Sequence, residues 1–440
     1  MWNSCVEVPR ISPLMRVTIC VLLAVLTLSA QDDAKQRAKA VREYGKNATS
    51  DAIPKLEIYI TDPDVDVRRE AVKAIVDIGT ARSLDPLAKF CSDNDPEIQI
   101  RAVDGLVNFY LPGYIKTGLT ASLKRVGATI KSKFTDTNTQ VVDVYVQVRP
   151  EVAVAIGRVV RGGASPEARA NAARAAGVLR AKEAVPDLEE ALRSKDSEVL
   201  YEALIALQKI RDQSAGPSVA IRLHDLDEKV QIAAIETTGL LDNRAAVNDL
   251  RGIVDRSRNM KVKRAALTAM AEMPDPQLHG VYTAYLENKD DGLREAAAEG
   301  LARINDPGDN ATLERLYESE GKTGPRLSLA FALVAIGKRS MGEFDPLRYL
   351  VNNLNSAAYH DSAQPYLTEL ARNPDVRRAL YPALHDPMAT KDEKIGLARV
   401  FAASGGEDSV APLETLSADT DTEVSEEARR ALRNLRARLP

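Results

Sequence analysis

Apolar and small side chains recur along this chain at the spacing of an amphipathic helix. In residues 64–75 (DVDVRREAVKAI), Val67, Ala71 and Ile75 fall on one helical face, and charged side chains occupy much of the rest. The same pattern, roughly D-x-x-V-R-x-x-A-x-x-A-L, returns many times. It predicts helices that begin near residues 64, 95, 165, 196, 227, 259, 290 and 421.

Each of these helices is expected to start at a residue that can cap it. An Asp, Ser or Asn stands at every start, where its side-chain oxygen can accept a hydrogen bond from a free backbone N–H. Apart from one gap, the repeat has a period of 31 to 34 residues when it is aligned on these anchors: Ala71, Ala102, Ala172, Ala203, Ala234, Ala266, Ala297, Leu329, Ala363, Leu397 and Ala428. A unit of two helices of about twelve to fourteen residues cannot bury its own apolar face, so the units must stack.

The first helix of each unit begins beside a proline in several copies, as in PDLEEALRS from Pro186 and PLAKFCSD from Pro86. With these features, the repeat resembles HEAT repeats, particularly the short variety of phycobilin lyases and many bacterial repeat proteins. The resemblance covers residues 49–440 except for one irregular stretch. It implies an all-α fold, an α-solenoid or superhelix of about 11–12 tandem two-helix repeats. Such a fold says little about function.

The repeat register breaks once, between Ala102 and Ala172. The step is 70 residues, which we interpret as two periods with several extra residues. Residues 114–135 predict an amphipathic helix, and the β-branched run over 141–148 predicts an extended crossing. The basic side of the helix is a candidate contact for an acidic or membrane surface, or else the solvated side of a repeat helix. Its residues are Lys116, Lys124, Arg125, Lys131 and Lys133.

The N-terminus carries a candidate targeting segment. Residues 17–30 (VTICVLLAVLTLSA) hold no charge over fourteen positions, and Arg10 and Arg16 precede them. This is short for a membrane span and typical of a signal peptide, so we expect residues 1–30 to be removed and the protein to be exported, periplasmic or extracellular. Met15 is an alternative start. An uncleaved N-terminal membrane anchor is the alternative reading of the segment.

The predicted organisation has four parts: a signal peptide over 1–30, HEAT-like repeats over 31–112, an irregular insertion over 113–148, and HEAT-like repeats over 149–440 that continue the first set. Removal of residues 1–30 would leave Cys91 as a lone cysteine, so no disulfide can form within the mature chain. Cys91 lies on an apolar helix stripe, which predicts a packed thiol rather than a reactive one.

Composition and charge narrow the classes of partner. Hydrophobic residues make up 45% of the chain and charged residues 28%, while aromatic residues are only 5%. The formal net charge is −4 and the pI is near 5.8, with both signs interspersed. A nucleic-acid binder needs a clustered positive field, which the chain as a whole lacks. A HEAT-like DNA glycosylase is therefore disfavoured, and export opposes it too.

No motif for catalysis or metal binding emerges. The four histidines are His224, His279, His360 and His385, and none shares the i, i+4 spacing of a zinc helix. His360, Asp361 and Ser362 are consecutive, so on a helix they point in different directions and cannot form a relay. We expect a protein that is not an enzyme, with no cofactor, no metal and no catalytic residue. Arg68, Arg169 and Arg294 recur beside the caps and are expected to pair with neighbouring turns.

The resemblance also suggests where a partner lies, because the second helix of each HEAT pair generally lines the concave face. The residues two beyond the anchors form a column of mixed charge, which suits a protein or peptide partner. The column comprises Lys73, Asp104, Arg174, Ile205, Glu236, Thr268, Glu299, Phe331, Arg399 and Arg430.

The leading hypothesis is a non-catalytic scaffold that binds a protein or peptide partner of unknown identity on this face. One alternative is a bilin lyase or isomerase, as in the phycobilin-lyase relatives, although a cleaved signal peptide speaks against it. Another is an adaptor associated with a membrane surface through residues 113–135.

Overall fold

The computed structural model describes residues 33–46, 48–114 and 140–439. Within these ranges the chain forms α-helices and short 3₁₀ turns, with no strand, so the predicted all-α solenoid is confirmed. The predicted signal peptide lies outside the described residues. So does almost all of the predicted basic helix, including Lys116, Lys124, Arg125, Lys131 and Lys133.

The described chain divides into two compact units. The first contains the described residues up to 114 together with residues 150–175. Its helices are residues 33–45, α2 (Ile53–Glu57), α3 (Val65–Ile78), α4 (Leu84–Phe90), α5 (Pro96–Tyr110), α8 (Pro150–Gly162) and most of α9 (Pro166–Val178).

The second unit contains residues 140–149 and those from 176 onward. Its first helices in each pair are α10 (Val185–Ala191), α12 (Gly216–Ala220), α14 (Val247–Arg256), α16 (His279–Tyr285), α18 (Asn310–Ser319), α20 (Pro346–Asn352), α22 (Pro374–Leu384) and α24 (Val410–Leu416). Its second helices are α11 (Ser197–Ile210), α13 (Glu228–Leu240), α15 (Met260–Ala271), α17 (Asp291–Ile304), α19 (Thr323–Ala335), α21 (His360–Leu370), α23 (Lys391–Ser404) and α25 (Thr422–Arg436).

The predicted capping column is confirmed at every position. Asp64, for example, accepts hydrogen bonds from the backbone N–H groups of Asp66 and Val67 at the start of α3. Ser165 accepts one from Ala168 at the start of α9. The other side chains that cap their helices in this way are Asp95, Asp196, Asp227, Asn259, Asp290 and Asp421. These bonds satisfy N–H groups that the helix leaves without partners.

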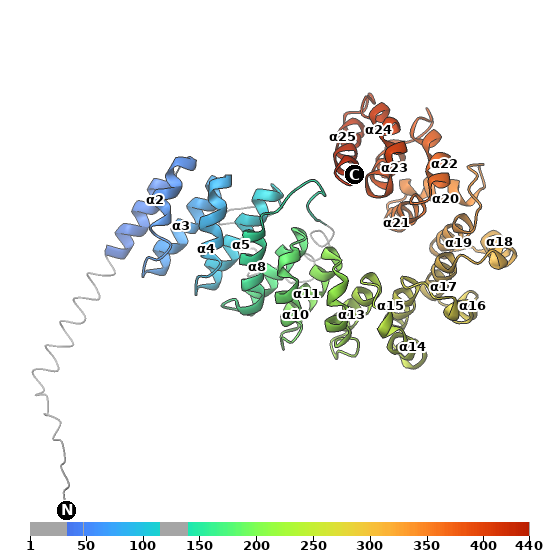
Figure 1. Ribbon diagram of the computed structural model, residues 1–440, viewed down its shortest axis with the longest axis horizontal. Coiled ribbons are helices and arrows are strands. Elements are labelled where there is room, and N and C mark those ends of the chain that lie inside the picture. The colour runs from blue at the N-terminus through green and yellow to red at the C-terminus, as the bar shows by residue number, and fades with distance from the viewer. Residues whose placement is uncertain (1–32, 47, 115–139, 440) are drawn as a thin grey trace, which may run out of the picture. The chain divides into compact units, whose positions relative to one another are not determined.

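Second helices pack against second helices in sequence order. In the second unit the row runs α11, α13, α15, α17, α19, α21, α23 and α25, and each contacts the next (Figure 1). A continuous apolar core follows this row from Leu223 to Leu435. Many of its members are alanines, such as Ala266 and Ala297, whose small side chains allow close approach of the helices. The core therefore belongs to the stack and not to any single repeat.

The expected pairing of the recurrent arginines with turns is confirmed for Arg68 and Arg294, whereas Arg169 bonds a carbonyl near the end of helix α8. The Arg68 guanidinium donates to Asp93 in the turn of the following repeat at 2.7 Å and to the Asp62 carbonyl at 2.9 Å. Arg294 makes the same pair of contacts with Glu320 and the Asn288 carbonyl, and Arg169 donates to the Val160 carbonyl. Arg68 and Arg294 thus connect polar turns of neighbouring repeats.

The stack continues across the irregular insertion in the first unit. The Asn171 amide of α9 donates to Asp104 of α5 at 3.1 Å, and the Ala164 N–H donates to the Gln99 side chain at 2.8 Å. Helix α8 packs on α4. Because the Asn171 contact places α9 next to α5, one described repeat, α8 with α9, follows α5, and our interpretation of the 70-residue step as two periods is wrong. Residues 115–139 of this step lie outside the described residues.

Cys91 is confirmed as a packed side chain. It is buried in the first unit, and burial raises the pKa of its thiol to about 12. The thiol is thus protonated at neutral pH, which is the unreactive form.

Candidate partner-binding groove

An open groove crosses the second helices of three successive pairs. Its volume is about 760 Å³, and it runs over α13, α15 and α17. The lining residues are Ile232, Glu236, Lys261, Arg264, Ala265, Thr268, Lys289, Asp290, Asp291, Gly292, Glu295 and Glu299. Because these helices pack side by side, the repeat itself creates the surface, and the residues that face outward from each helix decide its chemistry.

Two cations of α15 are held in place by carboxylates of the flanking helices. The Arg264 guanidinium donates to both oxygens of Asp290, the residue that caps α17. Lys261 donates to Glu228 of α13 at 3.0 Å. A Cβ at Gly292 would lie only 2.8 Å from the Arg264 side chain, so glycine there gives Arg264 room to cross the start of α17. The charges of the groove are therefore arranged before any partner arrives.

Glu295 of α17 repeats this crossing one unit further along. Its carboxylate lies where a Cβ at Gly324, near the start of α19, would have to stand. Burial, together with the charges of Glu299 and Asp291, raises the pKa of Glu295 to about 7. This carboxyl therefore changes its charge near neutral pH.

Arg303 of α17 gathers three carboxylates below the groove. It contacts Glu369 at 2.9 Å, Glu272 at 3.0 Å and Glu299 at 3.3 Å. Burial disfavours the charged guanidinium, but the carboxylates more than offset this and raise its pKa. Burial also raises the pKa of Glu272. The cluster links α17 to α15 and α21 through one side chain.

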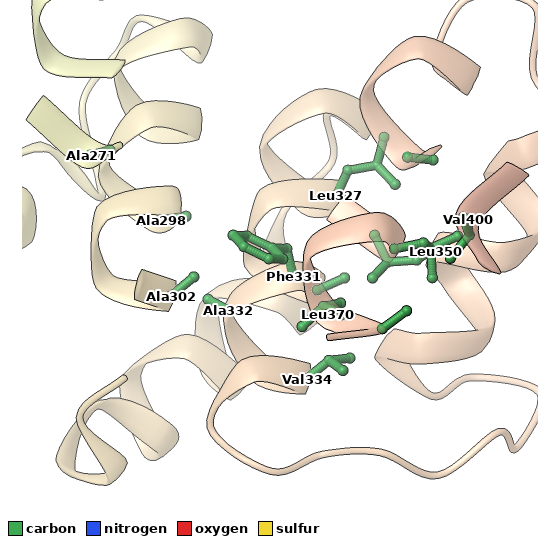
Figure 2. Packing of buried hydrophobic residues seen from close by; sticks show 14 of the residues in the cluster. Ala271, Ala298, Ala302, Leu327, Phe331, Ala332, Val334, Leu350, Leu370 and Val400 are labelled. Carbon is green, nitrogen blue, oxygen red and sulfur yellow. The ribbon is translucent and has the colours of Figure 1, made fainter. Parts of the chain in front are cut away.

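Aromatic side chains support the same cluster from α19 and α21. The Tyr366 hydroxyl donates to Glu299 at 2.5 Å, and the Tyr366 ring stacks on Phe331 with centroids 4.7 Å apart. The Arg303 guanidinium lies 5.5 Å from the Phe331 ring centre. Figure 2 shows Phe331 projecting toward the helix that carries Ala298 and Ala302. Glu299 is thereby held at the groove by contacts on two sides.

Glu236 lies on α13 and reaches solvent, yet its pKa is raised by burial. The two observations agree because Glu236 lines the groove. There its carboxylate is accessible to solvent and is also surrounded by protein.

The predicted column is distributed over several environments. Glu236, Thr268 and Glu299 line the groove together. Phe331 is buried beneath Arg303, with 1% of its surface exposed, so it supports the groove rather than facing it. Arg399 is exposed and pairs with Glu427 at 3.0 Å.

Three other members of the column, Lys73, Asp104 and Arg174, belong to the first unit, which has its own surface. Asp104 is buried there and accepts from Asn171.

Several groove residues were missed in the sequence. Arg264 and Glu295 stand five residues after their caps, at equivalent positions of consecutive repeats. A second column at that spacing would have found them. Arg303 had no such signal, because its partners Glu272 and Glu369 lie 31 residues before it and 66 after it.

The groove holds charges of both signs. None of its described lining residues is His, Cys or Ser. Elsewhere in the described chain, the His279 ring pairs with Asp309 at 2.9 Å, and His360 Nδ1 bonds the Leu354 carbonyl. No group of three or more His, Cys, Asp or Glu placed to hold a metal occurs in the ranges that the structure describes.

Comparison with known families identifies the repeat. The family described as HEAT repeats matches residues 21–107, 155–239 and 252–334, which together exceed half of the chain. The chain belongs to the HEAT-repeat family. No curated protein matches its sequence. Membership confirms the fold class and makes this a repeat protein of a kind suited to binding other proteins, without assigning a particular function.

The solved structures to which this HEAT-repeat chain is similar have low sequence identity with it. Importin beta, crystallised in an ammonium sulfate condition, is 15% identical with a TM-score of 0.37, over 87% of this chain and 56% of that one. The CpcE and CpcF complex of phycocyanin lyase from Nostoc sp. PCC7120 is 16% identical with a TM-score of 0.35, over 68% and 94%. A structure concerning the interaction between cadherin and beta-catenin is 14% identical with a TM-score of 0.39, over 91% and 97%.

None of the helices in the ranges that the structure describes combines the length and the apolar character that a membrane span requires.

Proposed function

We propose that this HEAT-repeat chain is an exported, non-catalytic scaffold that binds a protein or peptide partner in the groove over α13, α15 and α17. The observation that carries the proposal is the groove itself, where carboxylates and cations from three successive repeats form one open surface. A lining of mixed charge complements a polypeptide, whose own surface is mixed, better than a polyphosphate. Export rests on the uncharged segment over residues 17–30.

The fixed geometry of the groove favours binding. Arg264 and Glu299 are already engaged by Asp290, Arg303 and Tyr366, so a partner need not order them. Side chains that are already ordered reduce the entropy lost on association. Carboxylates outnumber cations in the lining, and Glu236 and Glu295 are two of those that a lysine or arginine of the partner would meet.

Site-specific photocrosslinking in the source cells tests the proposal. A photoreactive amino acid at Thr268, inside the groove, should capture one defined protein. The same group at the exposed Asn248, on the first helix α14, is the matched control and should not capture it. In the protein that carries the photoreactive amino acid at residue 268, the double change Glu236→Lys and Glu295→Lys should reduce capture at least about tenfold. Two attractions to cations of the partner then become repulsions. Equal capture at both positions, or capture that survives the charge reversal, would contradict the proposal.

A further inference from the structure

Residues 140–149 of the second unit form neither helix nor strand, and they lie against the last helix of the chain. The central contact joins Asp143 to Arg430 of α25. The Arg430 guanidinium donates through Nε to both carboxylate oxygens, at 3.1 and 3.0 Å, and through Nη2 to Oδ1 at 2.9 Å. This two-pronged geometry is the strong form of an arginine–carboxylate pair. It lowers the pKa of Asp143 against the opposing effect of burial.

Asn434 bonds the same segment through both the nitrogen and the oxygen of its side-chain amide. Its Nδ2 donates to the Asp143 carboxylate at 3.1 Å, and its Oδ1 accepts from the Val144 backbone N–H at 3.0 Å. A side chain that bonds one backbone N–H and the preceding carboxylate fixes the register of the segment.

Arg433 makes a third contact between α25 and the segment. Its guanidinium lies 5.5 Å from the centre of the Tyr145 ring, within the range of a cation–π contact. Arg430, Arg433 and Asn434 are spaced i, i+3 and i+4, so α25 presents them on one side. We call these three residues the α25 face. It contacts the sequence Asp-x-Tyr where the segment turns, because the Val146 N–H donates to the Asp143 carbonyl at 3.0 Å.

The other end of the segment is held by the beginning of the same unit. The Val142 N–H donates to the Val178 carbonyl at 2.9 Å, and the Val142 side chain is buried. The Lys209 ammonium lies 3.5 Å from the Gln140 carbonyl. The segment therefore connects residues near the start of the second unit with its final helix, 287 to 291 residues further along the sequence.

The contacts between the segment and α25 are polar and lie at an accessible surface, as in a bound peptide, and are not those of a buried core. Val144 and Tyr145 remain 47% and 39% exposed, and the Arg430 side chain is 46% exposed. A segment held mainly by polar contacts at an accessible surface can be exchanged for another of the same chemistry.

We propose that the α25 face is a peptide-recognition site whose occupant in the free protein is the chain's own segment 140–149, and that it accepts an external segment that presents Asp-x-Tyr in the same turn. This site shares no residue with the groove over α13, α15 and α17 and does not depend on it. The tethered segment competes with any external one, because its effective concentration at the face is high.

The test uses a fluorescent peptide of residues 140–149 (QVVDVYVQVR) and the full chain. Asp143→Arg in the protein replaces the ion pair with repulsion from Arg430 and should vacate the face. The peptide should then bind this variant at least about tenfold more tightly than the wild-type protein, because self-occupancy reduces apparent affinity. Fluorescence anisotropy measures the two dissociation constants, and added salt should weaken binding.

Three matched changes decide the outcome. Adding Arg430→Asp to Asp143→Arg should re-form the internal pair with reversed charges and abolish peptide binding. Adding Arg429→Asp makes the same change of charge next to the face, where Arg429 contacts the Ser417 carbonyl instead, and should leave binding intact. A peptide with Asn in place of its Asp should bind weakly. Failure of the peptide to bind the Asp143→Arg variant more tightly than wild type, or binding that persists with Arg430→Asp, would overturn the proposal.

Discussion

At the scale of single residues, the groove contains a carboxyl group, that of Glu295, whose charge changes near neutral pH. Glu295 has a pKa near 7 in the folded chain, compared with an ordinary value of 4.5. Between these values the folded protein keeps a proton that the unfolded chain has released. Stability from this carboxyl is therefore lost as pH rises through that window, and the loss is complete above about pH 7.

Glu295→Gln should remove this dependence. The variant cannot ionise, so its melting temperature should rise relative to wild type as pH increases from 5 to 8, with the smallest difference at pH 5. Thermal unfolding in a buffer series measures the difference. Glu318→Gln, at an exposed position of α18, serves as the control for loss of one negative charge. A difference for Glu295→Gln that is independent of pH would show that the carboxyl does not titrate in this range.

At the scale of helices, close approach within a pair depends on individual glycines. Gly300 of α17 lies against Tyr282 of α16, and a Cβ at residue 300 would stand 2.5 Å from the ring. Tyr282 is fully buried, so the ring has little room to move. The contact therefore fixes the spacing of α16 and α17.

Gly300→Ala should destabilise the second unit by about 1–3 kcal/mol, the usual cost of overpacking a dense core. Chemical denaturation followed by circular dichroism measures the change. Gly280→Ala is the matched control, because no atom lies within 4 Å of its added Cβ and alanine favours the helix α16. If both variants unfold alike, the contact with Tyr282 does not limit the packing.

The sequence predicted the helical elements well because their signals are local. A cap such as Asp227 bonds residues two and three positions later, so its role can be recognised in one short window. Arg303 and Glu369 depend on how α17 and α21 stand relative to each other, and that is set by the whole stack between them. The predicted column therefore includes three residues of the groove lining, Glu236, Thr268 and Glu299, and it does not include the cluster beneath them.

The segment 140–149 shows the same limit more strongly. Its β-branched residues indicated an extended crossing. Residues 140–149 form no helix, but they turn between Asp143 and Val146. The contact of Asp143 with Arg430 could not be inferred, because no spacing rule relates residues 287 positions apart.

At the scale of the whole molecule, stability is shared between neighbours along the stack. Ala266 of α15 is fully buried in the row that includes α13 and α17. Each repeat contacts mainly the next, so damage at one position should spread to adjacent repeats and decline with distance.

Ala266→Asp places a charge in this core and should cost several kcal/mol locally, about 3 or more. Hydrogen–deuterium exchange should show protection lost in α13, α15 and α17 while α3 to α5 of the first unit keep theirs. Met260→Asp is the control, because Met260 is exposed in the first turn of α15, where a carboxylate is favourable. Simultaneous loss of protection in both units would show that they unfold as one.

The contact between segment 140–149 and α25 also sets an order of events during synthesis. Asp143 is made 287 residues before Arg430, and at the usual rate of 5–20 residues per second that interval is roughly 15–60 s. The repeats between them can stack as they appear, since each needs only its predecessor. The contacts of Asp143, Val144 and Tyr145 with α25 must wait until α25 has been made. A ribosome that stops before α25 would leave a product with most of its repeats folded, with Val142 bonded to Val178 and with Asp143 lacking Arg430.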